Sequence, residues 1–131
     1  MELSDMLNIS KVNVEEKIKE AIIKVKNELY GLDTNGTCQI YSSHIQNELQ
    51  ANHVLSFLIN TKDIGLDYKH YFVLVKDGED NYIVDLTYEQ FGYQEPKVLL
   101  QEGYMKVSEL ELRGYLRQLS KITCRHNRKG L

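Results

Sequence analysis

The chain has 131 residues, of which 42% are hydrophobic, so we expect one globular domain over residues 1–131 with a core of its own. A formal net charge of −3 gives no electrostatic reason to expect nucleic acid as a partner, and no apolar run is long enough for a membrane span. The first ten residues lack the basic and apolar layout of a secretory signal, which indicates a cytoplasmic chain as written.

The first predicted element is a helix over residues 14–30. Asn13 and Glu16 resemble a capping pair just before it. One apolar stripe then follows at helical spacing, consisting of Val14, Ile18, Ala21, Val25 and Leu29. This helix should pack against the core.

A loop rich in helix breakers, residues 31–36, leads into a second predicted helix over about 37–50. Cys38, Ser42, Ile45 and Leu49 recur at steps of four, three and four residues, which is helical spacing. Cys38 therefore lies in the first turn, where unpaired N–H groups and the helix dipole lower the pKa of a thiol and favour an oxyanion. The alternative is that Cys38 is a small buried hydrophobic residue.

A short strand at 54–59 and a polar connection at 60–68 precede a predicted antiparallel hairpin. Its strands, 70–76 and 81–86, are apolar, β-branched and aromatic, and the residues between them are typical of a turn. A tip at 78–79 pairs Asp77 with Asp80, and therefore Phe72 with Asp85 and Leu74 with Ile83.

That register places His70 and Asp85 on one face of the hairpin, as diagonal neighbours roughly 7 Å apart at the backbone. Asp85 is the only charged residue in its apolar run, and a buried acid needs a partner, which His70 supplies. A slip of one residue would put the two on opposite faces. The alternative is a buried Asp85 bonded to backbone amides and a His70 at the exposed start of a strand.

The rest of the chain predicts an aromatic stretch at 87–92, a further strand at 98–100 and a C-terminal helix of about three turns. Ser108 and Glu111 form a capping box before that last helix. The pattern as a whole predicts an α+β fold, with the helix that carries Cys38 packed on a small antiparallel sheet.

Disulfides and metal sites are not expected. The only cysteines are Cys38 and Cys124, and a bridge between them remains an alternative that would consume the reactive thiol. Cys124 and His126, like His44 and His53, lack the spacing of paired zinc ligands. The basic tail at 125–129 is typical of a solvated end, with a phosphate contact as the alternative.

Three segments together resemble the core of papain-like and transglutaminase-like cysteine enzymes. They are Gly36-Thr-Cys38-Gln, His70-Tyr-Phe-Val-Leu-Val and Tyr82-Ile-Val-Asp85-Leu-Thr, within residues 31–92. The likeness is greatest to small bacterial papain-fold toxin or effector domains, such as glutamine deamidases and YopT-type peptidases, and arylamine N-acetyltransferases share the order Cys, His, Asp. The resemblance implies that Cys38 is the nucleophile, His70 the general base and acid, and Asp85 the group that holds the imidazole.

The oxyanion donor is left open by this resemblance. The Gln that precedes the catalytic Cys in papain has no counterpart here, because Asp33, Thr34 and Asn35 occupy that neighbourhood. Asn35, Gln39 and the backbone amide of Cys38 are the candidates.

The activity implied is acyl transfer through a thioester on an amide of a target protein, without a cofactor. Glutamine deamidation is favoured, with proteolysis or transglutamination as alternatives on the same residues. A toxin or effector of this kind would reach its target cell as part of a larger secreted protein and would have a cognate immunity or inhibitor protein as partner. The rival hypothesis is a noncatalytic binding or immunity protein with Cys38 in its core; the oligomeric state is open.

Overall fold

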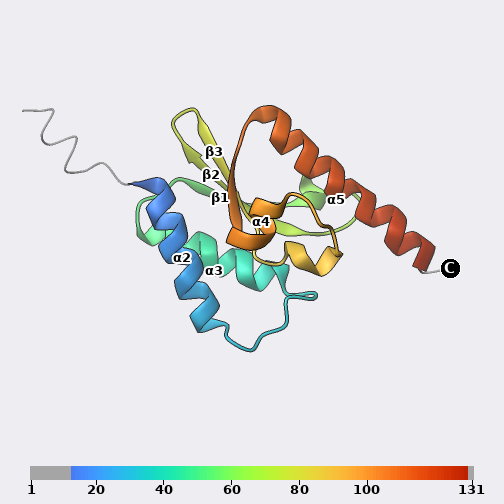
Figure 1. The fold of residues 1–131 in the computed structure, drawn as a ribbon, viewed down its shortest axis with the longest axis horizontal. Coiled ribbons are helices and arrows are strands. Elements are labelled where there is room, and N and C mark those ends of the chain that lie inside the picture. The colour runs from blue at the N-terminus through green and yellow to red at the C-terminus, as the bar shows by residue number, and fades with distance from the viewer. Residues whose placement is uncertain (1–12, 130–131) are drawn as a thin grey trace, which may run out of the picture.

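The computed structural model describes residues 13–129, and the side chains up to Lys121. It is an α+β fold built on an antiparallel sheet of four strands in the order β1-β2-β3-β4 (Figure 1). The strands are β1 (Ser56–Asn60), β2 (Tyr71–Asp77), β3 (Asp80–Val84) and β4 (Tyr104–Val107).

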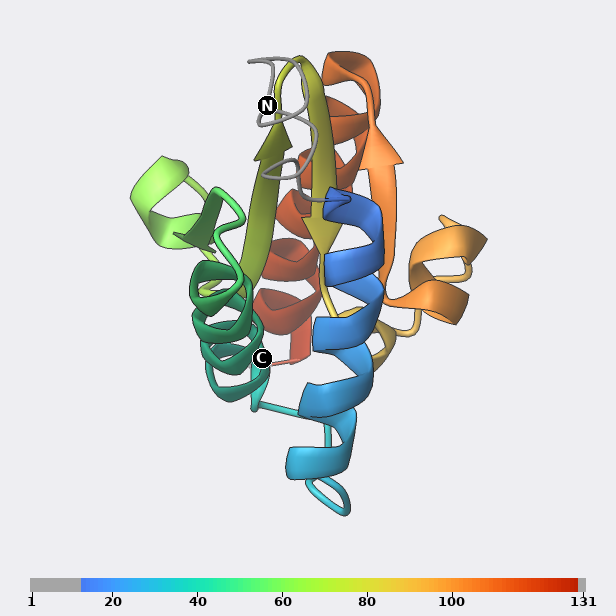
Figure 2. The same ribbon diagram turned by 90° about the vertical axis from the view of Figure 1, so that its left-hand side faces the viewer.

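Helices cover both faces of this sheet. Figure 2 shows α2 (Val14–Glu28) and α3 (Cys38–Ala51) on one side of the strands and α5 (Glu109–Lys129) on the other. Neighbouring residues of a strand point to opposite faces, so Val73 and Val84 pack toward α2 and α3, whereas Phe72 and Ile83 pack toward α5. The two central strands are therefore covered on both faces, whereas Phe57 of the edge strand β1 is exposed.

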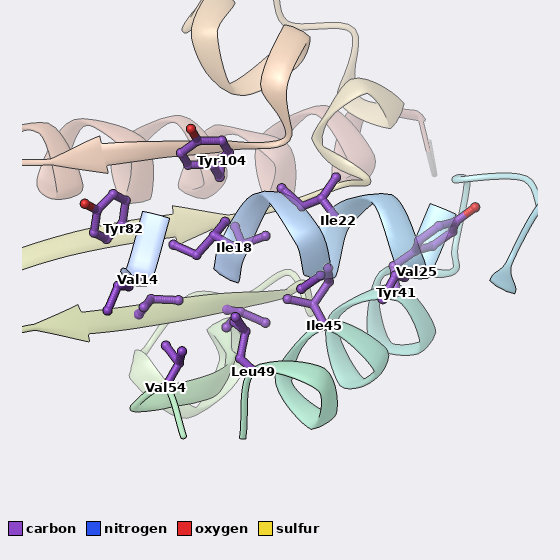
Figure 3. Close-up of a cluster of buried hydrophobic side chains, with 14 residues drawn as sticks. Val14, Ile18, Ile22, Val25, Tyr41, Ile45, Leu49, Val54, Tyr82 and Tyr104 are labelled. Carbon is purple, nitrogen blue, oxygen red and sulfur yellow. The ribbon is translucent and has the colours of Figure 1, made fainter. Parts of the chain in front are cut away.

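The core between the sheet and the first two helices confirms the two predicted apolar stripes. In Figure 3, Ile18 and Ile22 of α2 and Ile45 and Leu49 of α3 point toward one another, in the core that also holds Tyr82 and Tyr104 of the sheet. Asn13 caps α2 as predicted, because its Oδ1 accepts the Glu16 amide at 3.1 Å. The buried members contributed by the two helices are Val14, Ile18, Ala21, Ile22, Val25, Tyr41, Ile45 and Leu49.

The hairpin of β2 and β3 has the predicted register. Asp77 pairs with Asp80, and Leu74 pairs with Ile83. The ladder ends where Val73 pairs with Val84, one residue before Asp85. His70 and Asp85 therefore lie immediately beyond the paired strands, at one end of the sheet.

In the C-terminal third, one prediction was wrong and one strand was not predicted. Residues 98–100 belong to a short helix, α4 (Lys97–Glu102), and not to a strand; a run of three apolar residues cannot distinguish the two. Gly103, with a φ of 81°, ends that helix, and β4 then follows directly, a strand that the sequence did not indicate.

The last helix begins as predicted but is much longer. Ser108 and Glu111 form the reciprocal capping box, with bonds of 3.0 and 3.1 Å between backbone amide and side-chain oxygen. α5 then runs for 21 residues, and its second half is too polar to have given a periodic signal. Within residues 13–129, no helix combines the length and the apolar character needed to cross a membrane.

Candidate active site

Cys38 is the first residue of α3, as the sequence predicted, and it is a partly exposed free thiol. The loop before it is fixed by its own hydrogen bonds: the Thr37 hydroxyl donates to the Asp33 carbonyl at 2.6 Å, and the Asn35 amide donates to Asp33 Oδ1 at 2.9 Å. The sulfur thus lies beside the unpaired N–H groups that begin a helix. This is a setting that favours a thiolate.

The first turn of α3 is attached to the end of β2 through Tyr71. Because β3 stops opposite Val73, the backbone groups of Tyr71 on that side have no strand partner. The Tyr71 amide donates to the Cys38 sulfur, and the Tyr71 carbonyl accepts the hydroxyl of Ser42 at 3.1 Å. The first turn of α3 therefore supplies the partners for Tyr71 that β3 does not supply, and this brings Cys38 next to His70.

His70 is buried, with 1% of its surface exposed, and its backbone is held by Thr61. The His70 amide donates to the Thr61 hydroxyl at 2.8 Å, and the Thr61 amide donates to the His70 carbonyl at 2.9 Å. The ring of Phe91 meets the imidazole edge to face, with centroids 4.9 Å apart. These contacts leave the imidazole little freedom to turn.

Asp85 lies against His70, and the two form the contact that the hairpin register predicted. His70 Nε2 and Asp85 Oδ2 are 2.7 Å apart, and both side chains are buried. The other carboxylate oxygen, Oδ1, accepts the Thr87 amide at 3.1 Å and the Thr87 hydroxyl at 3.2 Å. Oδ2 also accepts the hydroxyl of Tyr115 at 2.7 Å. Four donors thus compensate the burial of this carboxylate.

The second nitrogen of the imidazole, Nδ1, indicates what this arrangement can do chemically. His70 Nδ1 is buried and has no hydrogen-bond partner of ordinary geometry among the described residues, yet the Cys38 thiol lies close enough to act on its pKa. Cys38, His70 and Asp85 thus form one cluster, with Nε2 on the carboxylate and Nδ1 toward the sulfur.

The pKa values of Cys38 and His70 both shift in favour of charge. Burial lowers the pKa of His70, but the charge and hydrogen bond of Asp85, together with Cys38, outweigh it and raise that pKa to about 9. Burial raises the pKa of Cys38, but the adjacent His70 side chain and the Tyr71 amide more than offset it, so the thiol pKa is lowered. Both shifts favour the charged forms, a thiolate and an imidazolium, over the neutral pair.

The Phe91 ring that meets the imidazole is itself packed against two tyrosines, Tyr68 and Tyr88. Tyr68 and Phe91 meet edge to face with centroids 6.1 Å apart, and Tyr88 and Phe91 do so at 6.2 Å. Burial, and secondarily the charge of Cys38, raise the pKa of the half-buried Tyr68. The predicted connection at 60–68 thus borders the site.

The two side chains proposed as oxyanion donors are exposed and are not brought to the sulfur. Neither the Asn35 nor the Gln39 side chain forms a hydrogen bond with a described residue. The third candidate, the backbone amide of Cys38, lies at the open N-terminus of α3 and fits the position best.

Sequence reasoning missed three residues of the site. Thr87 follows Asp85 by two positions, a spacing at which an Asp side chain often accepts a backbone amide, so this contact had a local signal. Tyr115 had none, since it lies on the apolar stripe of α5 like any core residue. Gln90 accepts the Gly36 amide at 3.0 Å from 54 positions away and ties the short helix η2 (Tyr88–Phe91) to the loop before Cys38.

Metal ligands do not gather in the part of the chain that can be described. Among the described residues, no group of three or more His, Cys, Asp or Glu side chains is placed to hold a metal ion. The side chains of Cys124, His126 and the basic tail at 125–129 lie outside the described residues.

Comparison of the chain with protein-family models, with curated proteins and with solved structures finds no significant match. The interpretation of the site therefore depends on its own geometry.

Proposed function

We propose that this protein is a cysteine-dependent acyl-transfer enzyme with a papain-like core, in which Cys38 is the nucleophile, His70 the general base and acid, and Asp85 the residue that orients the imidazole. The observation that carries the proposal is the disposition of the two nitrogens of His70. Nε2 is bound to a buried carboxylate at 2.7 Å, while Nδ1 is left for the thiol at the start of α3. A buried pair with only a structural role would not need a lowered thiol pKa beside it.

The first half of the proposed reaction forms a thioester. The Cys38 thiolate attacks the carbonyl carbon of an amide, and a carbon–sulfur bond forms. The helix N-terminus stabilises the negative charge that develops on the carbonyl oxygen. The carbon–nitrogen bond then breaks as His70 Nδ1 gives its proton to the departing nitrogen, which leaves as ammonia or an amine.

The second half releases the acyl group. The neutral His70 Nδ1 takes a proton from water, and the water oxygen attacks the thioester carbon. The carbon–sulfur bond breaks, the carboxylic acid product departs, and the thiolate and imidazolium are restored. Asp85 holds the ring through Nε2 in both halves, so the same nitrogen serves as acid and then as base.

Side-chain amides of protein glutamine are the substrates we favour. The described fold offers one small sheet with the cluster at its end, and such a domain has little room for a long peptide cleft. Proteolysis would use the same first half on a backbone amide, and transglutamination would replace water by an amine. The resemblance to bacterial toxin or effector domains extends the proposal to that role, with a protein substrate and a cognate immunity protein as partners.

Cysteine reactivity tests the proposal. The protein is treated with iodoacetamide between about pH 5 and pH 9, and the modified cysteine is mapped by mass spectrometry, with Cys124 as the internal control. We expect selective labelling of Cys38 at low pH that weakens in His70→Ala and in Asp85→Asn. Equal labelling of both cysteines, or labelling that does not depend on His70, would instead indicate a noncatalytic binding protein.

Product analysis separates the three reactions. Ammonia released from a target protein of unchanged length indicates deamidation. A shortened chain indicates proteolysis, and an incorporated amine indicates transglutamination. In each case Cys38→Ala is the control that should abolish the product.

A further inference from the structure

The hydroxyl of Tyr115 and the imidazole of His70 bond to the same carboxylate oxygen of Asp85. Both donate to Asp85 Oδ2 at 2.7 Å, and Tyr115 is buried, with 3% of its surface exposed. Bonds of this length to a carboxylate are charge-assisted and are stronger than those between neutral groups. We infer that Tyr115 is a positioning residue of the site, which fixes the Asp85 carboxylate for His70 and sets the pH range in which the imidazole stays protonated. This inference rests on the proposed function, because it concerns the regulation of the same residues.

The orientation of the carboxylate depends on donors to both of its oxygens. Thr87 holds Oδ1 through its amide and hydroxyl, and Tyr115 holds Oδ2 beside His70. Without the Tyr115 hydroxyl, one side of the carboxylate would be held by the imidazole alone. Any rotation of Asp85 would then carry the imidazole with it, and Nδ1 would move relative to the Cys38 sulfur.

The packing of the Tyr115 ring does not explain why this residue carries a hydroxyl. The Tyr115 ring meets Phe72 edge to face at 5.0 Å and lies 5.7 Å from the ring of Tyr88. A phenylalanine would keep both of these contacts. The only group that it would lose is the one that bonds to Asp85.

Tyr115 remains a donor over the whole useful pH range. Burial and the charge of Asp85 raise its pKa well above the ordinary value, so the hydroxyl keeps its proton. A donor on Oδ2 withdraws part of the negative charge that attracts the imidazolium. Removing that donor should therefore raise the pKa of His70 further.

The titratable groups near the pair formed by His70 and Asp85 come from several elements. They are Cys38 on α3, Tyr68 in the loop before β2, Tyr88 on η2 and Tyr115 on α5. The Tyr115 hydroxyl donates to Asp85, whereas that of Tyr88 donates to the Glu95 carbonyl. The C-terminal helix is thus part of the site, although it is the last element of the chain.

The test is an NMR titration of the His70 ring in wild type, Tyr115→Phe and the control Tyr104→Phe. Tyr104 is also buried, but it lies in the core on the other face of the sheet, and its hydroxyl donates to Glu15 Oε2 at 2.9 Å. We expect the pKa of His70, about 9 in the wild type, to rise by roughly half a unit or more in Tyr115→Phe and to stay unchanged in Tyr104→Phe. An unchanged value in Tyr115→Phe, or equal shifts in both variants, would overturn the inference.

A second variant covers the case in which Tyr115→Phe does not fold. A fluorinated tyrosine placed at position 115 is a stronger acid and a stronger donor of nearly the same size, so it should lower the pKa of His70. A rise or no change with this residue contradicts the inference. The titration needs no substrate: if the shifts occur while Cys38 labels no faster than Cys124, the proposed enzyme fails and the role of Tyr115 in orienting Asp85 stands.

Discussion

Ser42 donates a hydrogen bond of 3.1 Å to the carbonyl of Tyr71, and this bond joins the helix that carries Cys38 to the strand that follows His70. Ser42 is one turn after Cys38 and is almost fully buried. It lies on the inner face of α3 with Ile45 and Leu49, so its place in the apolar stripe had already been indicated by the sequence. The contact fixes both the height and the rotation of the first turn of α3 relative to β2.

Replacement of Ser42 by alanine should therefore affect stability and reactivity together. The variant leaves the Tyr71 carbonyl buried without its partner, which should cost about 1–3 kcal/mol in the free energy of unfolding. The labelling rate of Cys38 at low pH should also fall, because the sulfur is no longer held beside His70. Urea unfolding and iodoacetamide kinetics measure the two effects, and Ser43→Ala, next to it on the same helix, is the control. A loss of stability with unchanged labelling would contradict the positioning argument.

Thr61 offers a separate test of how His70 is held. Its fully buried hydroxyl accepts the His70 amide and donates to the Tyr68 carbonyl. Thr61→Val keeps the shape and removes both bonds, so we expect a loss of about 2 kcal/mol or more in the free energy of unfolding and slower labelling of Cys38. Thr61→Ser retains the hydroxyl and should recover most of the labelling rate. If Thr61→Val labels as fast as the wild type while Thr61→Ser is slow, the methyl group and not the hydroxyl is what matters at this position.

The part of the site that could be predicted is the part that depends on local periodicity. A turn centred on residues 78–79 fixes the register of the hairpin, and a strand period of two then places His70 and Asp85 on one face. The start of α3 follows in the same way from a breaker-rich loop and helical spacing after Cys38. The hairpin pattern was enough to predict the contact between His70 and Asp85, and the helical pattern was enough to place Cys38 in the first turn of a helix.

The remainder depends on packing between distant segments, which leaves no pattern in a single sequence. Tyr115 bonds to Asp85 across 30 positions, and Gln90 bonds to Gly36 across 54. A tyrosine in an apolar stripe has the same periodicity whether its hydroxyl meets solvent or a buried carboxylate. The strand β4 was missed for a related reason, since its four residues form a strand only by pairing with β3.

The pKa shifts of the pair predict how stability changes with pH. The folded pKa of His70 is about 9, above the ordinary 6.5, so its contribution to stability is complete below about 6.5 and is lost as the pH rises through about 9. The lowered pKa of Cys38 acts in the opposite sense, because its contribution grows as the pH rises toward the ordinary 9.0 of a thiol. In the wild type the two trends oppose each other.

Cys38→Ala should reveal the contribution of His70 alone, since Asp85 still raises its pKa. We expect the free energy of unfolding of this variant to fall between about pH 6 and about pH 10, as the imidazolium loses its proton in the folded state. Urea unfolding at a series of pH values measures the fall. The double variant Cys38→Ala with His70→Gln removes the titrating group and is the control for lysines and tyrosines. Parallel pH profiles for the two variants would show that His70 is not protonated in the folded protein near pH 7.

The oxyanion donor can be assigned by comparing side-chain and backbone candidates. The side chains of Asn35 and Gln39 are exposed and form no hydrogen bond with a described residue, whereas the Cys38 amide lies at the open N-terminus of α3. Loss of a true oxyanion donor lowers kcat by about 10²–10³-fold.

Asn35→Ala and Gln39→Ala should each lower the rate of acyl transfer by less than about ten-fold, because a backbone amide survives both substitutions. The measurement is kcat for release of ammonia or amine, with the labelling rate of Cys38 as the control that the nucleophile itself is intact. A loss of a hundred-fold or more in kcat with normal labelling would assign the donor to the substituted side chain. In that case the loop at 31–37 or the first turn of α3 must close over the substrate, since neither side chain is held toward the sulfur in this structure.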